Sequence, residues 1–402
     1  MPPERKTEIL YLNHVSRMSG AEASLLSLLT HLDTGVYRPV IGVPAPGPLV
    51  EQLRAMDIEV VFLEHPRLRR SGNPLRLVRQ YVDLRRGAEK IAAHVGEERV
   101  DIIHANSLSS ALAAGRAAGD GAALIWHVRD LRLPRPVTRR LIRQADAIVA
   151  ISKAVAARLV EMDRRAADKT RVVYNGVDTE AFAPRPSRAK LLAELGLPDN
   201  ALLVGGVGQL VPWKNWPRFL SVGADVAARA ANTRLLIIGG DLFHDYPHYT
   251  AELKAYAEDL AIGRITHFLG HRSDIADVVS ALDVFVHCTD DEPLGRAIME
   301  AMSLQRPVVA VRSGGPAELI VDGESGLLAP PRNTYAIADR VVQVLKDREL
   351  AGRLGQAARL RVESHFRPEQ TARLVEQIYQ DVLWQRRGAP APPDPRPLFR
   401  GP

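Results

Sequence analysis

The first half of the chain alternates short apolar segments with longer amphipathic ones. The apolar segments are rich in β-branched residues and mostly lack strict polar alternation, which is typical of parallel strands buried on both faces. Helical patterns lie between them, for example Ala21–Leu32. This alternation predicts a doubly wound parallel α/β sheet. The expected strands are Glu8–Asn13, Arg38–Val43, Ile58–Leu63, Val100–Ala105, Ala123–Val128 and Ala147–Ser152.

The second half repeats this alternation after a break. Turn residues at Asn175–Asp178 and the proline-rich stretch Ala183–Ser187 separate the halves. We therefore expect two similar α/β domains joined by a linker, with ligands bound in a cleft at the carboxyl ends of the strands. The strands expected in the second domain are Leu202–Gly208, Arg234–Gly240, Ile265–Gly270, Asp283–Cys288 and Pro307–Val311.

The domain boundaries follow from this pattern. We expect a first domain at residues 1–174, a linker at 175–187 and a second domain at 188–369. A helix is expected at 370–387, and the proline-rich tail at 388–402 is expected to be disordered.

The composition is that of an ordinary soluble globular protein. The 402 residues suffice for two domains, and 46% are apolar and 25% charged. No apolar run reaches the roughly 18 residues that span a bilayer, and the N-terminus shows no signal peptide. Because Cys288 is the only cysteine, no intrachain disulfide can form, which favours a cytoplasmic location. Its apolar strand predicts a buried thiol rather than a nucleophile.

Positive charge is concentrated in the first half. Residues 1–173 contain 27 Lys and Arg against 19 Asp and Glu, whereas the remainder has 26 against 28. Two arginine-rich segments dominate, His65–Gly87 and Val128–Arg143. They indicate either an anionic partner or solvated helix faces. Since they lack interleaved aromatic residues, we expect no nucleic-acid partner but a weak, peripheral contact with the anionic inner face of a membrane.

The segment EPLGRAIMEAM, Glu292–Met302, carries the most informative chemistry. It lies between two apolar runs, and its two glutamates, Glu292 and Glu300, are eight residues apart. If most of this span is helical, they lie roughly 12 Å apart along the axis, which suits one carboxylate near each end of a nucleotide-sugar. The N–H groups around Gly295 and Arg296 are expected to open a helix, and helix N-termini bind phosphate.

This segment resembles the Glu-x7-Glu motif of the family-4 retaining glycosyltransferases. The resemblance implies the GT-B fold, in which two Rossmann-like domains face a central cleft. It implies an acceptor-binding first domain, a nucleotide-sugar-binding second domain and a C-terminal helix that crosses back to the first. Further segments resemble the family in its order: Val173–Phe182, Gly208–Asn215, Phe268–Val286, Gly314–Ile320 and Asp322–Pro331.

The resemblance also implies a reaction. We expect transfer of a sugar from a nucleotide-diphosphate sugar, most plausibly a UDP-sugar, to an acceptor hydroxyl, with an α-linked product. No cofactor and no metal are expected, and the sequence has no spacing typical of metal ligands. The pair Asp290–Asp291 is interpreted as non-metal. Lipid-linked glycans, exopolysaccharide intermediates and small aglycones remain open as acceptors.

The family's donor contacts map onto the second domain. Lys214 is expected to neutralise the departing diphosphate with Gln209, which replaces the usual arginine. Glu300 resembles the glutamate that accepts from the ribose hydroxyls, and Glu292 the one near the donor sugar; a carboxylate accepts bidentate bonds from vicinal hydroxyls. The remaining donor-side candidates are Leu294, which replaces a more usual aromatic residue, Gly295, Arg296 and, from the first domain, Gly20.

The first domain is expected to supply the other groups. Gly20 resembles the family's glycine loop, with Ser19 in place of its first glycine. His127, at a strand end, resembles the histidine that faces the anomeric centre; with Lys214 and Glu292 it completes the catalytic candidates. A structural role for His127 is the alternative. The acceptor-side candidates are Asn13, Glu22, which equally suits a helix first turn, Arg129 and Asp130.

Two other classes of function are compatible with parts of the sequence. Gly206-x-Gly208 after a strand suggests an NAD-dependent oxidoreductase, but the third glycine of that fingerprint is missing and Pro212–Trp213 interrupts the expected helix. A membrane-surface or nucleotide-binding protein without catalysis is the second alternative. The ordered set of family motifs favours the glycosyltransferase.

Overall fold

The computed structural model describes residues 5–66, 73–119 and 121–387. The chain forms two compact units: unit 1 is Met1–Gly176 with Pro368–Pro402, and unit 2 is Val177–Arg367. Each unit is a parallel sheet with helices around it, which confirms the doubly wound α/β fold. The expected disordered tail, residues 388–402, lies outside the described residues, as do residues 67–72 of the first arginine-rich segment.

Unit 1 contains a seven-stranded sheet in the order β3-β2-β1-β4-β5-β6-β7. The strands are β1 (Thr7–Leu12), β2 (Tyr37–Val43), β3 (Glu59–Phe62), β4 (Ile102–Ala105), β5 (Ala123–Val128), β6 (Ala147–Ala150) and β7 (Thr170–Val172). The helices are α1 (Gly20–Thr30), α2 (Pro48–Ala55), α3 (Pro74–Glu98), α4 (Leu108–Ala117), α5 (Arg135–Gln144), α6 (Lys153–Met162), α7 (Ala166–Lys169) and α16 (Pro368–Arg386).

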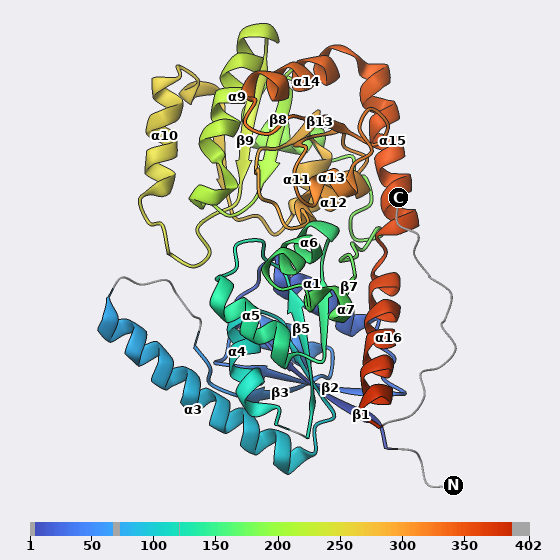
Figure 1. Ribbon diagram of the computed structural model, residues 1–402. Coiled ribbons are helices and arrows are strands. Elements are labelled where there is room, and N and C mark those ends of the chain that lie inside the picture. Colours follow the sequence, from blue (N-terminus) through green and yellow to red (C-terminus); the bar gives the residue numbers. More distant parts are fainter. Residues whose placement is uncertain (1–4, 67–72, 120, 388–402) are drawn as a thin grey trace. The chain divides into compact units, whose positions relative to one another are not determined.

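The C-terminal helix α16 is part of the unit 1 core. Its apolar residues, such as Val375 and Tyr379, pack with α1 and α2 against strand residues such as Ile9 and Ile125. In Figure 1, α16 (red) runs along one side of this unit and α3 (blue) along the other. The unit is therefore completed by a segment that follows the whole of unit 2 in the sequence.

Unit 2 contains a six-stranded sheet in the order β10-β9-β8-β11-β12-β13. The strands are β8 (Leu202–Val207), β9 (Thr233–Ile238), β10 (Thr266–Gly270), β11 (Val284–His287), β12 (Val308–Val311) and β13 (Leu327–Ala329). The helices are α8 (Arg188–Glu194), α9 (Trp216–Arg229), α10 (Tyr249–Asp259), α11 (Ile275–Ser280), α12 (Arg296–Ser303), α13 (Pro316–Leu319), α14 (Thr334–Lys346) and α15 (Arg348–His365), with short 3-10 turns η1 (Pro212–Lys214) and η2 (Gly263–Ile265).

In both units the strand order reverses beside the first strand. The reversal lies between β1 and β4 in unit 1 and between β8 and β11 in unit 2. At such a point the connecting helices leave toward opposite faces of the sheet, so the carboxyl edge is free to bind a ligand. The candidate residues after β1, β8 and β11 therefore belong to ligand-binding edges.

Two edge strands were missed by the sequence analysis. Strands β7 and β13 have three residues each, which is too short to show a hydrophobic pattern. Residues 177–187, most of the expected linker, lie in unit 2, where Arg185 and Ser187 bond to α11. Among the described residues, no helix has the length and hydropathy needed to cross a bilayer.

Candidate active site

A buried ion pair lies at the carboxyl end of β11. Lys214, in the turn η1 after β8, places its Nζ 2.6 Å from Glu292 Oε2, and His287 Nε2 donates to the same oxygen at 2.9 Å. The side chains of Lys214 and Glu292 are only 16% and 9% exposed. The structure thus brings together two of the three catalytic candidates and adds His287, which the sequence analysis did not select.

Glu292 is ionised in this arrangement. Burial raises the pKa of its carboxyl group, but the charge of Lys214 and the hydrogen bond from His287 outweigh burial and hold the pKa at about 2. Within the described part of the chain, its second oxygen, Oε1, accepts no hydrogen bond. One carboxylate oxygen therefore remains for a ligand.

Lys214 is fixed by its surroundings. Its Nζ lies 4.4 Å above the centroid of the Trp213 ring, and its carbonyl accepts from Thr289 Oγ1 at 3.2 Å. An ammonium group has three donors, so the bond to Glu292 leaves two for a bound anion. Gln209, which precedes this turn in the sequence, is half-buried. Its backbone carbonyl accepts from Trp216 Nε1 at 2.8 Å.

Gly295 starts the helix that follows. It is the N-cap of α12 with φ +105°, a backbone conformation that favours glycine. A Cβ on Gly315 would lie 2.2 Å from Leu294 Cα, and Gly315 N donates to Glu292 O at 2.9 Å, so these two loops are in direct backbone contact. The predicted helix start at Gly295 and Arg296 is confirmed. The first backbone N–H groups of α12 come directly after the loop that carries Glu292.

The Glu292–Glu300 span is helical only from Arg296 onward, whereas the roughly 12 Å spacing requires a helix along the whole span. Helix α12 begins only at Arg296, because the left-handed conformation of Gly295 ends the preceding loop. The axial spacing of roughly 12 Å therefore does not apply. Glu300 lies one turn into α12 and pairs with Arg296, whose Nε is 2.7 Å from its Oε1.

Leu294 and Cys288 point into the protein. Leu294 is 2% exposed, so its side chain packs in the interior, and what it offers a ligand is backbone. Cys288 is buried as predicted, and burial raises the pKa of its thiol to about 12. The thiol is thus protonated at neutral pH and is not a nucleophile.

A second ion pair braces the same loop. Arg218 of α9 binds Asp290 through its two terminal guanidinium nitrogens, at 2.6 and 2.8 Å. It also donates to Cys288 O at 3.2 Å. Hydrogen bonding from Arg218 lowers the pKa of Asp290 below its usual value. Among the described residues, no three His, Cys, Asp or Glu side chains are placed to share a metal ion. No sequence pattern linked Arg218 to this loop.

The geometry after β8 does not fit a dinucleotide fingerprint. The turn η1 and Asn215 separate β8 from α9, which begins only at Trp216. A dinucleotide site needs the helix to open directly at the glycine turn, where its N-terminus meets the pyrophosphate. The interruption predicted at Pro212–Trp213 is confirmed, and the oxidoreductase alternative loses its only support.

Unit 1 carries a hydrogen-bonded polar cluster at the ends of β1, β4 and β5. Asn13 Nδ2 donates to Glu22 Oε1 at 3.0 Å, and Asn106 Nδ2 donates to Asn13 Oδ1 at 3.0 Å. Arg129 Nε donates to Asn106 Oδ1 at 2.9 Å, and its NH1 reaches Asn175 Oδ1 at 3.1 Å. Three of the four acceptor-side candidates thus belong to one network.

Glu22 occupies the first turn of α1 and is also buried. Helix α1 begins at Gly20 with Ser19 as its N-cap, and Ser19 Oγ donates to Glu22 Oε2. Glu22 is only 1% exposed, whereas Gly20 is on the surface. Glu22 therefore lies in the first turn of α1 as predicted and joins the polar cluster, while its acceptor-side role stays a prediction. The fourth acceptor-side candidate, Asp130, is exposed.

His127 ends a chain of neutral side chains. Its Nδ1 lies 3.0 Å from His104 Nε2, and His104 Nδ1 lies 2.6 Å from the Tyr379 hydroxyl of α16. Tyr379 in turn donates to the Tyr11 hydroxyl at 2.9 Å. Burial, reinforced by the charge of Arg129, lowers the pKa of His104 to about 3 and that of His127 well below its usual value.

The second ring nitrogen of His127, Nε2, is buried and has no hydrogen-bond partner in the described part of the chain. Buried polar atoms are nearly always paired, so an unpaired one at a strand end indicates a place for a ligand or a water. His104, Asn106 and Tyr379 were not among the residues predicted from the sequence. The first two lie at the polar end of an apolar strand, which is the signal that would have found them.

The chain matches two family models. Residues 18–181 match the model described as Glycosyltransferase Family 4, and residues 187–361 match Glycosyl transferases group 1. Each match falls within one structural unit except for a few residues at the boundary. The matches therefore cover both parts of the fold.

Known relatives agree with these models. D-inositol 3-phosphate glycosyltransferase from Stackebrandtia nassauensis is 31% identical over 317 residues, covering 72% of this chain and 70% of the relative. N-acetyl-alpha-D-glucosaminyl L-malate synthase from Bacillus anthracis is 27% identical over 308 residues, covering 74% and 78%. The crystal structure of Anabaena Alr3699/HepE in complex with UDP-glucose has a TM-score of 0.79 and 25% identity, covering 93% of this chain and 99% of that one. The chain therefore belongs to the family-4 glycosyltransferases, with the two Rossmann-like domains of the GT-B fold.

Proposed function

We propose that this glycosyltransferase is a retaining enzyme that moves a sugar from a UDP-sugar to an acceptor hydroxyl and forms an α-glycosidic bond. The observation that carries the proposal is the buried Lys214–Glu292 pair, which precedes the amino end of α12. The choice of UDP is supported by the Anabaena structures in complex with UDP-glucose and with UDP and glucose. The α-linkage is supported by the family resemblance.

In this proposal unit 2 binds the donor. The diphosphate lies at the amino end of α12, where the N–H groups around Gly295 and Arg296 and the ammonium of Lys214 offset its charge. Gln209 adds a hydrogen bond without adding charge. Glu300 accepts from the ribose hydroxyls, and Glu292 accepts from the donor sugar through Oε1, its unused oxygen.

The same groups promote departure of the diphosphate. Negative charge grows on the phosphate oxygen as its bond to the anomeric carbon breaks, and cations held in place beforehand stabilise that charge without reorganising. Since Lys214 and the α12 amino end supply positive charge, we propose that no divalent metal is required. The acceptor oxygen attacks from the face that the diphosphate leaves.

Unit 1 supplies the acceptor-side groups. His127 Nε2 has no partner among the described residues, so a sugar or acceptor hydroxyl can take that position. Asn13, Glu22 and Arg129 hold the surrounding network in place, and Gly20 offers backbone N–H at the start of α1. A neutral imidazole orients a hydroxyl without repelling the carbocation character of the reacting sugar.

The test is a thermal-shift and donor-hydrolysis screen with UDP-, GDP-, ADP- and dTDP-sugars, each with EDTA present. We expect stabilisation by the UDP series alone and slow hydrolysis of one UDP-sugar. Proton NMR of the sugar released at early times, and later of the transfer product, reports its anomeric configuration. Stabilisation by another nucleotide contradicts the donor, activity only after metal addition contradicts metal independence, and a β-anomer contradicts retention.

A further inference from the structure

Helix α3 exposes apolar side chains on the face opposite the one it buries. Leu75, Val78 and Val82 are 79%, 61% and 38% exposed, and at 3.6 residues per turn they lie within about 60° of one another. The buried residues of this helix, such as Ile91 and Val95, lie on the other side. Most of the surface of Leu75 and Val78 therefore takes no part in the packing of α3 in its own unit.

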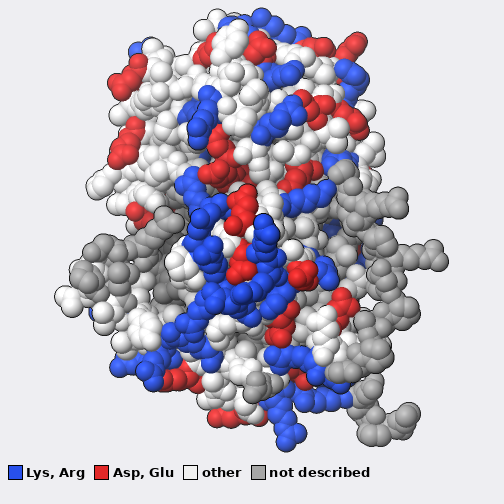
Figure 2. Space-filling model, viewed as in Figure 1, with Lys and Arg blue, Asp and Glu red and all other residues white. Residues whose placement is uncertain are grey.

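Arginines lie on the same face. Arg79 and Arg86 flank the three apolar residues at helical spacing, and both are exposed without a carboxylate partner among the described residues. Between Pro74 and Arg86 the only carboxylate of the helix is Asp83, which is half-buried and lies beside both arginines at helical spacing, so the net charge of this stretch stays positive. Figure 2 shows Lys and Arg gathered over α5 and along part of α3.

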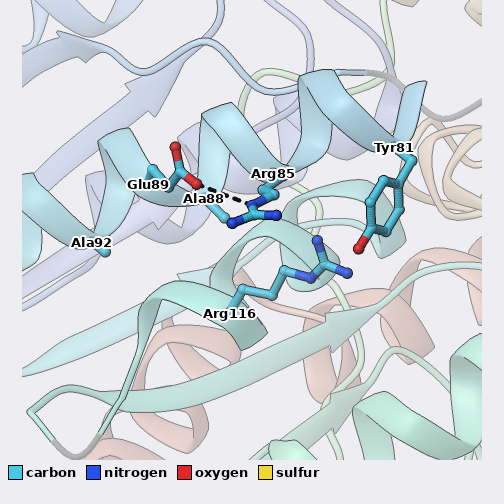
Figure 3. Close-up of a pocket in the computed structure, with 6 residues that line it drawn as sticks. All are labelled: Tyr81, Arg85, Ala88, Glu89, Ala92 and Arg116. Atoms are coloured by element: carbon cyan, nitrogen blue, oxygen red, sulfur yellow. Dashed lines mark hydrogen bonds and ion pairs between the residues drawn. The ribbon is translucent and has the colours of Figure 1, made fainter. Parts of the chain in front are cut away.

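A hollow between α3 and α4 continues this surface. Its volume is about 330 Å³, and the guanidinium of Arg116 lies 5.0 Å from the centroid of the Tyr81 ring (Figure 3). Arg85 pairs with Glu89 at 3.2 Å, but both side chains are more than 60% exposed, so this pair is weak and can open. The hollow therefore offers two guanidinium groups to an anion. Its lining residues are Tyr81, Arg85, Ala88, Glu89, Ala92 and Arg116.

The combination of aliphatic and cationic side chains indicates which partner binds this face of α3. A second copy of the chain packed on this face would bring together two surfaces of net positive charge, which repel. A nucleic acid would contact the arginines but would leave the aliphatic side chains without an apolar partner. An anionic bilayer satisfies both: Leu and Val enter the boundary between headgroups and acyl chains, and arginines stay at the phosphates.

We propose that the α3 stripe, defined as Leu75, Val78, Arg79, Val82 and Arg86, docks unit 1 onto an anionic lipid bilayer. The adjacent hollow receives a phosphate headgroup between Arg85 and Arg116. This inference gives a location to the membrane contact expected from the charge of the first half. It concerns unit 1 alone and does not depend on the proposed donor chemistry.

Flotation of the full chain with phosphatidylcholine vesicles, with and without phosphatidylglycerol, tests the proposal. We expect binding only to the anionic vesicles. Arg79→Gln with Arg86→Gln lowers partitioning about 25-fold, since each arginine near an anionic surface contributes about fivefold. Val78→Ser with Val82→Ser lowers it at least about fivefold through lost apolar burial. The matched controls in unit 2, Leu360→Ser and Arg348→Gln with Arg353→Gln, leave binding unchanged.

A fluorescent label reports insertion directly. Because Cys288 is buried, a cysteine introduced as Val78→Cys is the accessible thiol for an environment-sensitive dye. Anionic vesicles should shift its emission to the blue, while the same dye on Leu360→Cys in unit 2 stays unchanged. Each label is read in the full chain, after the melting temperature of the variant has been compared with that of the parent.

Four results would overturn the proposal. They are equal recovery with neutral and anionic vesicles, equal losses in the α3 variants and the unit 2 controls, a dye at position 78 that does not respond, and a concentration-dependent dimer that the Val78→Ser, Val82→Ser change abolishes. The last result would assign the α3 stripe to a second copy of the chain instead.

Discussion

Ion pairs build the strand-end cluster of unit 2, whereas mostly neutral side chains build that of unit 1. In unit 2, Lys214 and Glu292 form a buried pair, and Arg218 holds Asp290 beside it. In unit 1, two histidines and two tyrosines form a continuous hydrogen-bonded chain. A cation with spare donors suits a diphosphate, whereas neutral donors and acceptors suit hydroxyls. The difference supports a donor half in unit 2 and an orienting half in unit 1.

Replacing Lys214 tests the charged half most severely. Lys214→Ala should lower the transfer rate roughly 100- to 1,000-fold, because it removes a charge placed for the departing diphosphate. Steady-state rates measured with the preferred donor give the effect. Since the change leaves Glu292 buried without its cation, we expect some loss of stability as well.

The double variant Lys214→Ala, Glu292→Gln separates these effects. It should regain part of the lost stability, because no buried charge remains unpaired, yet stay as slow as the single variant. Arg218→Gln, which breaks the neighbouring pair, is the matched control and should retain more activity. Near-normal turnover of Lys214→Ala would remove its proposed role.

Substitutions in unit 2 and in unit 1 should also differ in their effect on nucleotide affinity. Glu300→Gln should weaken UDP binding about tenfold, as expected for the loss of a charge-assisted hydrogen bond. His127→Gln should leave UDP affinity unchanged and lower turnover about tenfold. Isothermal titration calorimetry measures the affinities. If His127→Gln weakened UDP binding as much as Glu300→Gln, the division of labour would be wrong.

Acid should destabilise the two units in different pH ranges. His104 has a folded pKa of about 3, below the usual value of roughly 6.5, so the unfolded state binds more protons between these values. Its contribution to stability is therefore lost as the pH falls below roughly 6.5. Glu292, with a folded pKa of about 2, loses its contribution only below roughly pH 4.3.

Melting curves recorded from pH 7 to about 2.5 measure this difference. Between pH 6.5 and 5, His104→Gln should remove a slope of up to about 1.4 kcal/mol per pH unit. Glu292→Gln should leave that range unaltered and change the profile only below it. Identical profiles for the His104 variant and the parent would mean that folding does not lower the pKa of His104.

The smallest effect concerns the C-terminal helix. Tyr379→Phe removes a hydroxyl that bonds His104 and Tyr11, and we expect a loss of about 1–2 kcal/mol in unfolding free energy with UDP affinity unchanged. Tyr37→Phe is the matched control, because its hydroxyl also bonds α16, through Glu376 O at 3.4 Å, but does not bond His104 or Tyr11 among the described residues. Equal losses in both variants would show that the chain through His104 adds nothing.

The fold was predictable because its evidence is local. Strands buried on both faces need apolar residues at nearly every position, and segments such as Ala123–Val128 show this directly. Glycine at a left-handed position leaves an equally local trace, so the start of α12 at Gly295 was also predicted. Lys214, Glu292 and His127 were selected because each follows or ends an apolar strand within a family motif.

The partners of these residues became visible only in the folded chain. Lys214 and Glu292 are 78 residues apart in the sequence, Arg218 and Asp290 are 72 apart, and Tyr379 and His104 are 275 apart. Hydrophobic periodicity reports which face of a segment is buried but not which segment covers it. The ion pairs, the neutral chain through His104 and the depressed pKa of Glu292 arise only where packing brings distant side chains together and excludes water.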